Sequence, residues 1–264
     1  MKPASLRTLL LAALLACLLA GPALAQPTAA EIVGKANLAA YYAGKDGRAQ
    51  VKMTITDSQG RSRQREFVIL RRDVADGGEQ TFYVYFQKPA DVRRMVFMVH
   101  KQMERDDDRW LFLPGLDLVR RIAASDKRTS FVGSHFLYED VSGRNPTEDR
   151  HELLETTPEY FLLKHTPKDP AGVEFSSYTT RIDRKTFLPM RAEYLDKEGR
   201  AYRVVEALEV KEIQGHPTVV RSRVQDLAGG ETVSVFENIR YDIGLSTEIF
   251  SERYLRNPPR EVRN

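Results

Sequence analysis

Most of the chain alternates between apolar and polar residues in short runs separated by turns, and this pattern restricts the fold most strongly. In residues 49–56, for example, Val51, Met53 and Ile55 alternate with polar side chains, as in a strand with one buried face. We count about eleven such strands with no helices between them, so neighbouring strands must be antiparallel. The pattern predicts a large curled antiparallel sheet. The turn sequences lie at 57–60, 77–78, 197–199, 214–215 and 229–230.

One amphipathic helix is predicted before the first strand. Thr28 and Glu31 have the spacing of a capping box, and apolar residues recur at helical spacing from Ile32 to Ala43. Gly44 is a suitable end for this helix.

The first 25 residues have the pattern of a secretory signal peptide. Lys2 and Arg7 precede an apolar run at 9–20, and small residues at 23–25 predict cleavage before Gln26. The run of about 12 residues is shorter than the roughly 20 that a transmembrane helix needs. An alternative is lipid attachment at Cys17, because the preceding residues loosely resemble a lipobox. Cleavage before Gln26 would remove the chain's single cysteine and with it any disulfide or thiolate site.

The charge balance argues against a nucleic-acid partner. The 264-residue chain has 40 Lys and Arg against 37 Asp and Glu. Without Lys2 and Arg7 in the signal, 38 basic side chains remain against 37 acidic ones, a net charge of +1. A protein held to nucleic acid by charge is far more basic. We expect residues 26–264 to form a single domain, which is an ordinary size for an all-β fold.

A long segment at about 125–149 interrupts the strands and is predicted to be a lid. It lacks sustained alternation but contains Phe131, Phe136 and Tyr138, so it is not a solvated linker. Ser134 is predicted to cap a short helix that runs to about Val141. If the aromatic residues of the sheet pack only against one helix and this lid, the interior is filled. Alternatively, eleven strands enclose more volume than these elements fill, and a ligand cavity remains.

Few residues have the spacing of a catalytic or metal site. The five histidines are scattered, and the sequence around Ser134 and His135 lacks the second glycine of a nucleophile elbow. Glu139 and Asp140 form a carboxylate pair among aromatic residues, which is conceivable for acid–base chemistry but is expected more often to cap a helix or pair with arginine. We expect no metal, no cofactor and no enzymatic activity.

Two sequence blocks resemble a known family. The first runs DRWLFLP at 108–114, VRRI at 119–122 and SDK at 125–127, and the second is SFVGSHFLYED at 130–140. Together they resemble the outer membrane lipoprotein-sorting proteins, which are relatives of the periplasmic carriers LolA and LolB. The chain's end at 244–255 also resembles that family's ending. His135 stands where such proteins commonly carry aspartate, so no required charge is assigned there.

The resemblance implies a half-open antiparallel β-barrel whose helical lid covers a hydrophobic cavity for acyl chains. It also implies a periplasmic carrier that moves lipoproteins or other lipids towards the outer membrane, with an inner-membrane exporter of the resistance-nodulation-division (RND) type as partner. We expect a monomer with transient membrane contact. Lipid-dependent sensing through a protein contact is the alternative function, and a hydrolase using Glu139, Asp140 or His135 is a third.

Side-chain positions then predict the site. Arg120 or Arg121 is predicted to meet a lipid head group or a partner protein. In the lid, Ser134, Glu139 and Asp140 are the candidate polar residues. The residues predicted to line the cavity are Phe97, Trp110, Phe112, Phe131, Phe136 and Tyr138.

Overall fold

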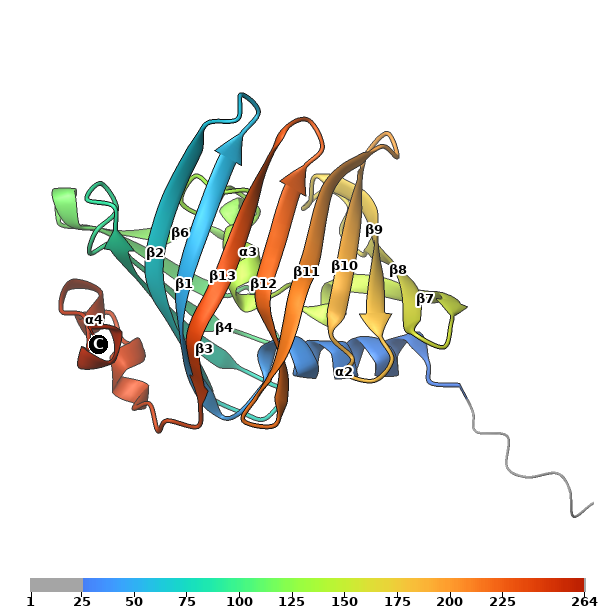
Figure 1. Ribbon diagram of the computed structural model, residues 1–264, viewed down its shortest axis with the longest axis horizontal. Helices are drawn as coiled ribbons and strands as arrows, with labels where there is room; N and C mark the ends of the chain where they lie inside the picture. The colour runs from blue at the N-terminus through green and yellow to red at the C-terminus, as the bar shows by residue number, and fades with distance from the viewer. Residues whose placement is uncertain (1–25, 264) are drawn as a thin grey trace, which may run out of the picture.

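The computed structural model describes residues 26–263, so the predicted signal peptide and Cys17 lie outside the described residues. These residues form one antiparallel sheet of thirteen strands that does not close into a barrel (Figure 1). Its order is β6-β5-β4-β3-β2-β1-β13-β12-β11-β10-β9-β8-β7. The bounds are β1 (Asp46–Asp57), β2 (Ser62–Asp73), β3 (Gln80–Lys88), β4 (Val96–Lys101), β5 (Asp108–Leu113), β6 (Leu118–Ile122), β7 (Asp149–Thr156), β8 (Tyr160–Pro167), β9 (Phe175–Asp183), β10 (Pro189–Asp196), β11 (Ala201–Ile213), β12 (His216–Asp226) and β13 (Gly230–Tyr241).

The mainly β, antiparallel architecture is confirmed, but the predicted number of about eleven strands is too low. Strands β3 and β4 show why. Residues 80–84 and 96–99 are buried at every position, because both faces of the sheet are covered there. Strands buried on both faces lose the apolar–polar alternation on which the count depends.

The sheet consists of two meanders joined at their first and last strands. Strands β1 to β6 run outward in sequence order, β7 to β13 run back from the opposite edge, and β13 pairs with β1. The chain therefore crosses from one edge of the sheet to the other between β6 and β7. This crossing, residues 123–148, is named the lid segment. It contains the short helices η2 (Ala124–Asp126), α3 (Tyr138–Ser142) and η3 (Pro146–Glu148).

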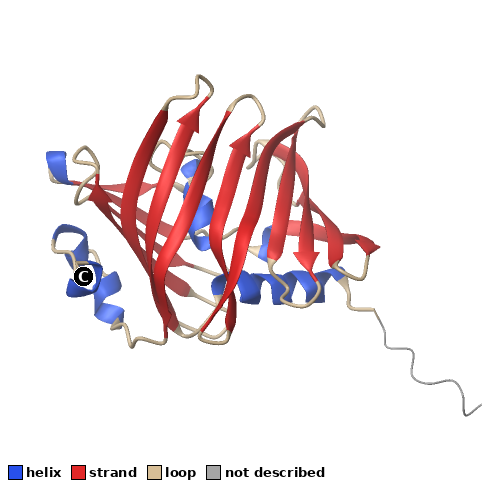
Figure 2. Cartoon of the chain, in the orientation of Figure 1, coloured by secondary structure: helices blue, strands red, loops and turns tan. Residues whose placement is uncertain are grey.

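Both faces of the sheet bury apolar side chains. On the inner face, Phe67, Phe86 and Phe97 pack against Phe131 and Tyr138 of the lid segment. On the outer face, the C-terminal segment covers a second cluster that includes Tyr83, whose hydroxyl donates a hydrogen bond to the carbonyl of Tyr254 at 2.6 Å. The C-terminal helices are η4 (Thr247–Phe250), α4 (Arg253–Arg256) and η5 (Arg260–Val262). Figure 2 shows how few helical residues accompany the large sheet.

The predicted N-terminal helix is present as α2 (Ala29–Tyr41), and both of its ends are fixed by side chains. At the start, Thr28 and Glu31 form the expected capping box. At the end, the Arg71 guanidinium of β2 donates to the carbonyls of Tyr41, Ala43 and Gly44 at 2.5–2.8 Å. A cation at this position satisfies carbonyls that have no partner within the helix. No helix among the described residues is long and apolar enough to cross a membrane.

Helix α3 begins later than predicted, and Ser134 does not cap it. The Ser134 hydroxyl donates to the carbonyl of Phe131 at 2.7 Å and so closes a tight loop before the helix. The cap comes from Asp140, whose carboxylate accepts a hydrogen bond from the backbone N–H of Leu137 at 2.7 Å. A serine can satisfy either a turn or a helix end, and its sequence alone does not distinguish them.

Gly143, directly after α3, allows the lid segment to approach α2 closely. Its φ of +75° lies in a region that residues other than glycine rarely adopt. A Cβ at this position would lie 2.5 Å from Cζ of Tyr41. We expect Gly143→Ala to lower the free energy of unfolding by about 3 kcal/mol, because backbone strain adds to overpacking. Gly199→Ala is the control, since Gly199 has a φ of +80° but no atom lies within 4 Å of the place that its added methyl group would take. Urea denaturation of both variants separates backbone strain from overpacking. Equal losses of unfolding free energy in the two variants would contradict the close contact between Gly143 and Tyr41.

Candidate functional site

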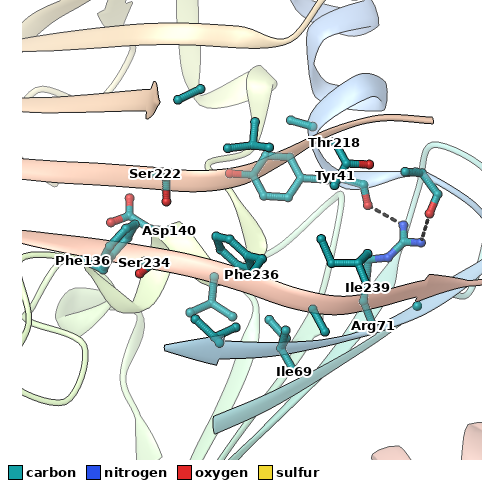
Figure 3. Close-up of a pocket in the computed structure, with 18 of the residues that line it drawn as sticks. Tyr41, Ile69, Arg71, Phe136, Asp140, Thr218, Ser222, Ser234, Phe236 and Ile239 are labelled. Atoms are coloured by element: carbon teal, nitrogen blue, oxygen red, sulfur yellow. Dashed lines mark hydrogen bonds between the residues drawn. The ribbon is translucent and has the colours of Figure 1, made fainter. Parts of the chain in front are cut away.

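An apolar cavity of about 410 Å³ lies between the inner face of the sheet, the end of α2 and the lid segment (Figure 3). Its walls come from strands at the centre of the sheet, which bring together residues far apart in the sequence. The apolar lining includes Ala49, Val51, Met53, Phe67, Ile69, Phe82, Val84, Phe131, Phe136, Val141, Leu188, Ala192, Val205, Ala207, Val219, Phe236 and Ile239.

Charged groups that line this cavity are engaged by neighbouring protein groups. Arg71 donates its hydrogen bonds to the end of α2 and to Asp73. Glu206 accepts hydrogen bonds from Arg191 and Arg223, and Asp140 accepts one from Arg203 at 2.5 Å. Each of these charged groups is thus paired, and most of the remaining lining is apolar.

The structure brings four of the predicted aromatic residues together beneath the lid segment. Phe131 and Phe136 line the cavity. Phe97 and Tyr138 are packed behind Phe131, with their ring centroids 5.4 Å and 5.7 Å from its own. They therefore support the cavity wall and do not form its surface.

Trp110 and Phe112 were predicted to line the cavity, and the structure corrects this placement. Their side chains lie on the outer face of the sheet, where they pack with the C-terminal cluster of Leu245 and Ile249. The residue between them, Leu111, belongs to the inner cluster instead. Alternation correctly separated the two faces, but both faces are apolar here. The sequence therefore did not show which of them is the inner one.

Arg120 and Arg121 also lie outside the cavity, on the edge strand β6. Arg121 pairs with Asp108 at 2.5 Å and lies over the Trp110 ring. Arg120 is exposed, with Asp126 at 3.8 Å. Neither residue is in a position to contact a head group inside the cavity.

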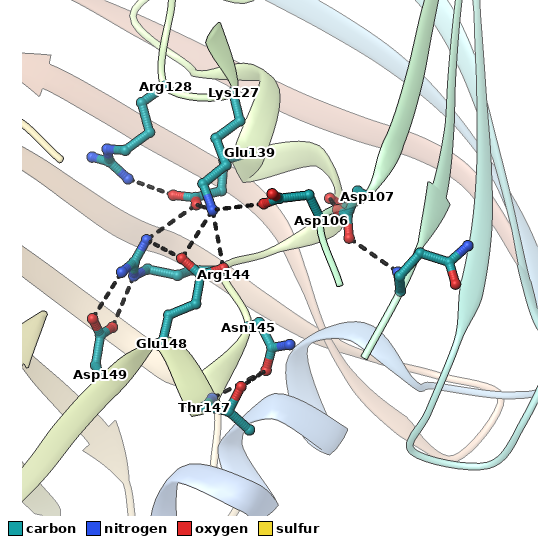
Figure 4. A network of polar contacts seen from close by, with 12 residues as sticks. Asp106, Asp107, Lys127, Arg128, Glu139, Arg144, Asn145, Thr147, Glu148 and Asp149 are labelled. Carbon is teal, nitrogen blue, oxygen red and sulfur yellow. Dashed lines mark hydrogen bonds and ion pairs between the residues drawn. The ribbon is translucent and has the colours of Figure 1, made fainter. Parts of the chain in front are cut away.

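The buried carboxylate of Glu139 is the centre of an ion-pair network in the lid segment (Figure 4). It accepts hydrogen bonds from Arg128 at 2.5 Å and Arg144 at 3.2 Å. Arg144 also forms two bonds of 2.9 Å with Asp149 at the start of β7. In the same way, Arg128 forms two bonds of 2.7 Å with Glu174, before β9. The lid segment is thereby attached to the β7 to β9 part of the sheet.

The environment of Glu174 shows the strength of this attachment. Burial alone would raise the pKa of Glu174, but the hydrogen bonds and the charge of Arg128 outweigh burial and lower that pKa to about 2. Such bidentate arginine–carboxylate pairs are among the stronger polar contacts in proteins. Glu139 pairs with Arg128 and Arg144, and Asp140 caps α3 and pairs with Arg203. Capping a helix and pairing with arginine are the more frequent roles of such carboxylates.

A family model with the description "-like: Uncharacterized protein" matches residues 78–257. The chain belongs to this family. No curated protein sequence matches the chain. Among solved structures, a DUF1329 family protein from Desulfovibrio piger is 28% identical, with a TM-score of 0.78 over 87% of this chain and 99% of that one.

Two further structures show the same fold. A domain described as an outer membrane lipoprotein-sorting protein, from Vibrio parahaemolyticus, is 24% identical, with a TM-score of 0.77 over 86% of this chain and 97% of that one. A LolA superfamily protein from Nitrosomonas europaea is 20% identical, with a TM-score of 0.67 over 87% and 100%. The resemblance predicted from the sequence blocks is confirmed, and the chain has the LolA-like fold.

Three histidines of this LolA-like chain form hydrogen bonds with neighbouring side chains. His135 lies with its Nδ1 2.8 Å from the Thr232 hydroxyl, between the lid segment and β13. His151 and His165 face each other across β7 and β8, with their Nδ1 atoms 2.7 Å apart. Among the described residues, no three His, Cys, Asp or Glu side chains are grouped so as to hold a metal ion.

The His165 contacts predict a pH-dependent stability. Its Nε2 lies 2.7 Å from the Thr180 hydroxyl, and burial lowers the pKa of His165 to about 3. The unfolded chain binds a proton near pH 6.5, so stability is complete above this pH and falls as the pH drops from 6.5 towards 3. We expect about 2 kcal/mol less stability at pH 5 than at pH 7 from this residue. Urea denaturation at both pH values should show a smaller decrease in His165→Gln, and an equal decrease would contradict the assignment.

The Glu139 network predicts a strongly destabilising substitution. Glu139→Ala leaves the buried guanidinium groups of Arg128 and Arg144 without their shared partner, so we expect a loss of about 3 kcal/mol of unfolding free energy. Glu212→Ala removes an exposed glutamate of β11 and should change stability by less than about 0.5 kcal/mol. Thermal or urea denaturation measures both. Similar small effects would show that the network does not hold the lid segment.

Proposed function

We propose that this protein is a periplasmic carrier that holds acyl chains of lipoproteins or other lipids in its cavity and transfers them towards the outer membrane. The observation that carries the proposal is the apolar cavity of about 410 Å³ under the lid segment. This volume lies within the range of about 300–1,000 Å³ that is typical of small-molecule sites. The LolA-like fold and the similarity to one domain described as lipoprotein-sorting support the same function.

The energetics of lipid transfer fit such a cavity. Each CH₂ group in water costs about 0.8 kcal/mol, so a sixteen-carbon chain costs on the order of 12 kcal/mol. A cavity lined by aliphatic and aromatic side chains accepts the chain at little net cost. Since uptake and release are then nearly balanced, extraction from the inner membrane requires a partner that supplies energy. By family resemblance, we propose an RND-type exporter in that membrane as the partner.

The edge strand β6 is the surface that we propose for partner contact. Arg120 and Arg121 are exposed there, and Leu116 in the preceding turn is 72% exposed. Basic and apolar side chains at an open sheet edge provide charge, apolar area and unpaired backbone groups for a protein. This proposal replaces the head-group role of the two arginines, because both lie outside the cavity.

A binding function agrees better than catalysis with the state of the candidate acid–base residues. Glu139 is held by two arginines, and Asp140 pairs with Arg203 and caps α3. His135 contacts Thr232 at two atoms. These contacts give each residue a structural role, and we propose that the protein is not an enzyme.

Blocking the cavity tests the proposal. Ala207 of β11 lines the cavity, whereas its neighbour Leu208 is not among the lining residues and is 41% exposed. In Ala207→Trp the indole occupies space for roughly two or more CH₂ groups, so we expect about tenfold less co-purified lipid. Leu208→Trp is the matched control and should retain its lipid. Native mass spectrometry of both variants, purified from the periplasm, measures the occupancy.

Two results would contradict the carrier function. One is a chain that carries no lipid under any of these conditions, and the other is an Ala207→Trp variant with unchanged lipid content. Circular dichroism of both variants excludes unfolding as the cause of a loss.

A further inference from the structure

One end of the cavity contains polar atoms that have no hydrogen-bond partner among residues 26–263. Ser222 and Ser234 are directly opposite each other on β12 and β13, and both line the cavity. In the view of Figure 3 these serines and Asp140 lie towards one end of the cavity, and Arg71 lies towards the other. Ser234 is 1% exposed, yet its Oγ has no hydrogen-bond partner in the part of the chain that the structure describes.

An unpartnered hydroxyl is unusual at this depth, because burying one without a hydrogen bond costs free energy. Thr232, two residues earlier on β13, is equally buried, but its hydroxyl accepts a hydrogen bond from the backbone N–H of His135. Phe236, two residues later, is apolar and also lines the cavity. Packing of the cavity wall therefore does not require a polar residue at position 234.

Asp140 adds an acceptor to the same end of the cavity. Its Oδ2 accepts hydrogen bonds from Leu137 and Arg203. Its Oδ1 has no hydrogen bond from any described residue. An ionised carboxylate only accepts hydrogen bonds, whereas a serine hydroxyl both donates and accepts them. The site thus offers an acceptor at Asp140 and donor–acceptor groups at the two serines.

We propose that this end of the cavity binds the hydroxyl group of an otherwise apolar molecule, such as a long-chain alcohol or a hydroxylated hydrocarbon. The ligand hydroxyl donates to Oδ1 of Asp140 and accepts from the Ser234 hydroxyl, with Ser222 beside them. This inference rests on the proposed lipid-binding function and specifies its ligand class. A carboxylate or phosphate fits poorly, since an ionised group has no hydrogen to donate to Oδ1 of Asp140.

A competition between two matched probes tests this inference. The full chain is purified from the periplasm, stripped of bound lipid and incubated with equal amounts of 1-hexadecanol and hexadecane, which lacks the hydroxyl group. Native mass spectrometry then measures the retained species. We expect about a tenfold preference for the alcohol, as one to two hydrogen bonds provide.

Three variants assign the preference to this site. Ser234→Ala removes the hydroxyl that donates to the ligand, so the preference for the alcohol should fall to about threefold or less. Ser222→Ala provides a second variant of the same cluster. Thr218→Val is the control, because the Thr218 hydroxyl also lines the cavity but is 2.9 Å from the Tyr241 hydroxyl. It should keep the preference. Ser234→Ala should also raise the urea midpoint of the ligand-free protein, since it removes an unpartnered buried group.

The outcomes separate the inference from the function on which it rests. Equal retention of both probes by the natural chain, or an unchanged preference in both serine variants, would overturn the hydroxyl site and leave the carrier function intact. Retention of neither probe would overturn both.

Discussion

The concave face of the thirteen-stranded sheet has to be shielded from water by much less chain than the sheet contains. Only the 13-residue helix α2 and the lid segment lie over it, among the residues that the structure describes. Side chains of strands on opposite sides of the curve, such as Val51 of β1 and Val205 of β11, both face the resulting space. Because a curved sheet of this size holds its walls apart, the remaining volume forms the cavity.

The two covering elements are held by buried charges as well as by apolar contacts. Arg71 fixes the end of α2 to β2, and Glu139 joins Arg128 and Arg144, which reach β7 and the start of β9. These interactions place the apolar rings of Phe131 and Phe136 over the cavity without filling it. Ion pairs are directional, so they fix the position of this cover while the space beneath it stays open.

Local sequence patterns predicted the helix, the antiparallel sheet and the aromatic crossing segment, because each depends on neighbouring residues. The capping box of Thr28 and Glu31 and the LolA-like resemblance are both confirmed. Trp110 and Phe112 were misplaced, since the C-terminal segment makes the outer face of β5 as dry as the inner one. The hydroxyl pair of Ser222 and Ser234 was missed, because two serines 12 positions apart carry no signal until β12 and β13 pair.

The sequence by itself determined the kind of molecule: a largely β chain with one capped helix and an apolar crossing segment. Periodicity and capping are encoded within a few residues, so they need no knowledge of the rest of the chain. The tertiary structure alone decided which side of each strand faces the cavity and which charges meet. Arg203 reaches Asp140 across 63 positions, and such contacts arise only when the curvature of the sheet brings distant strands and the lid segment together.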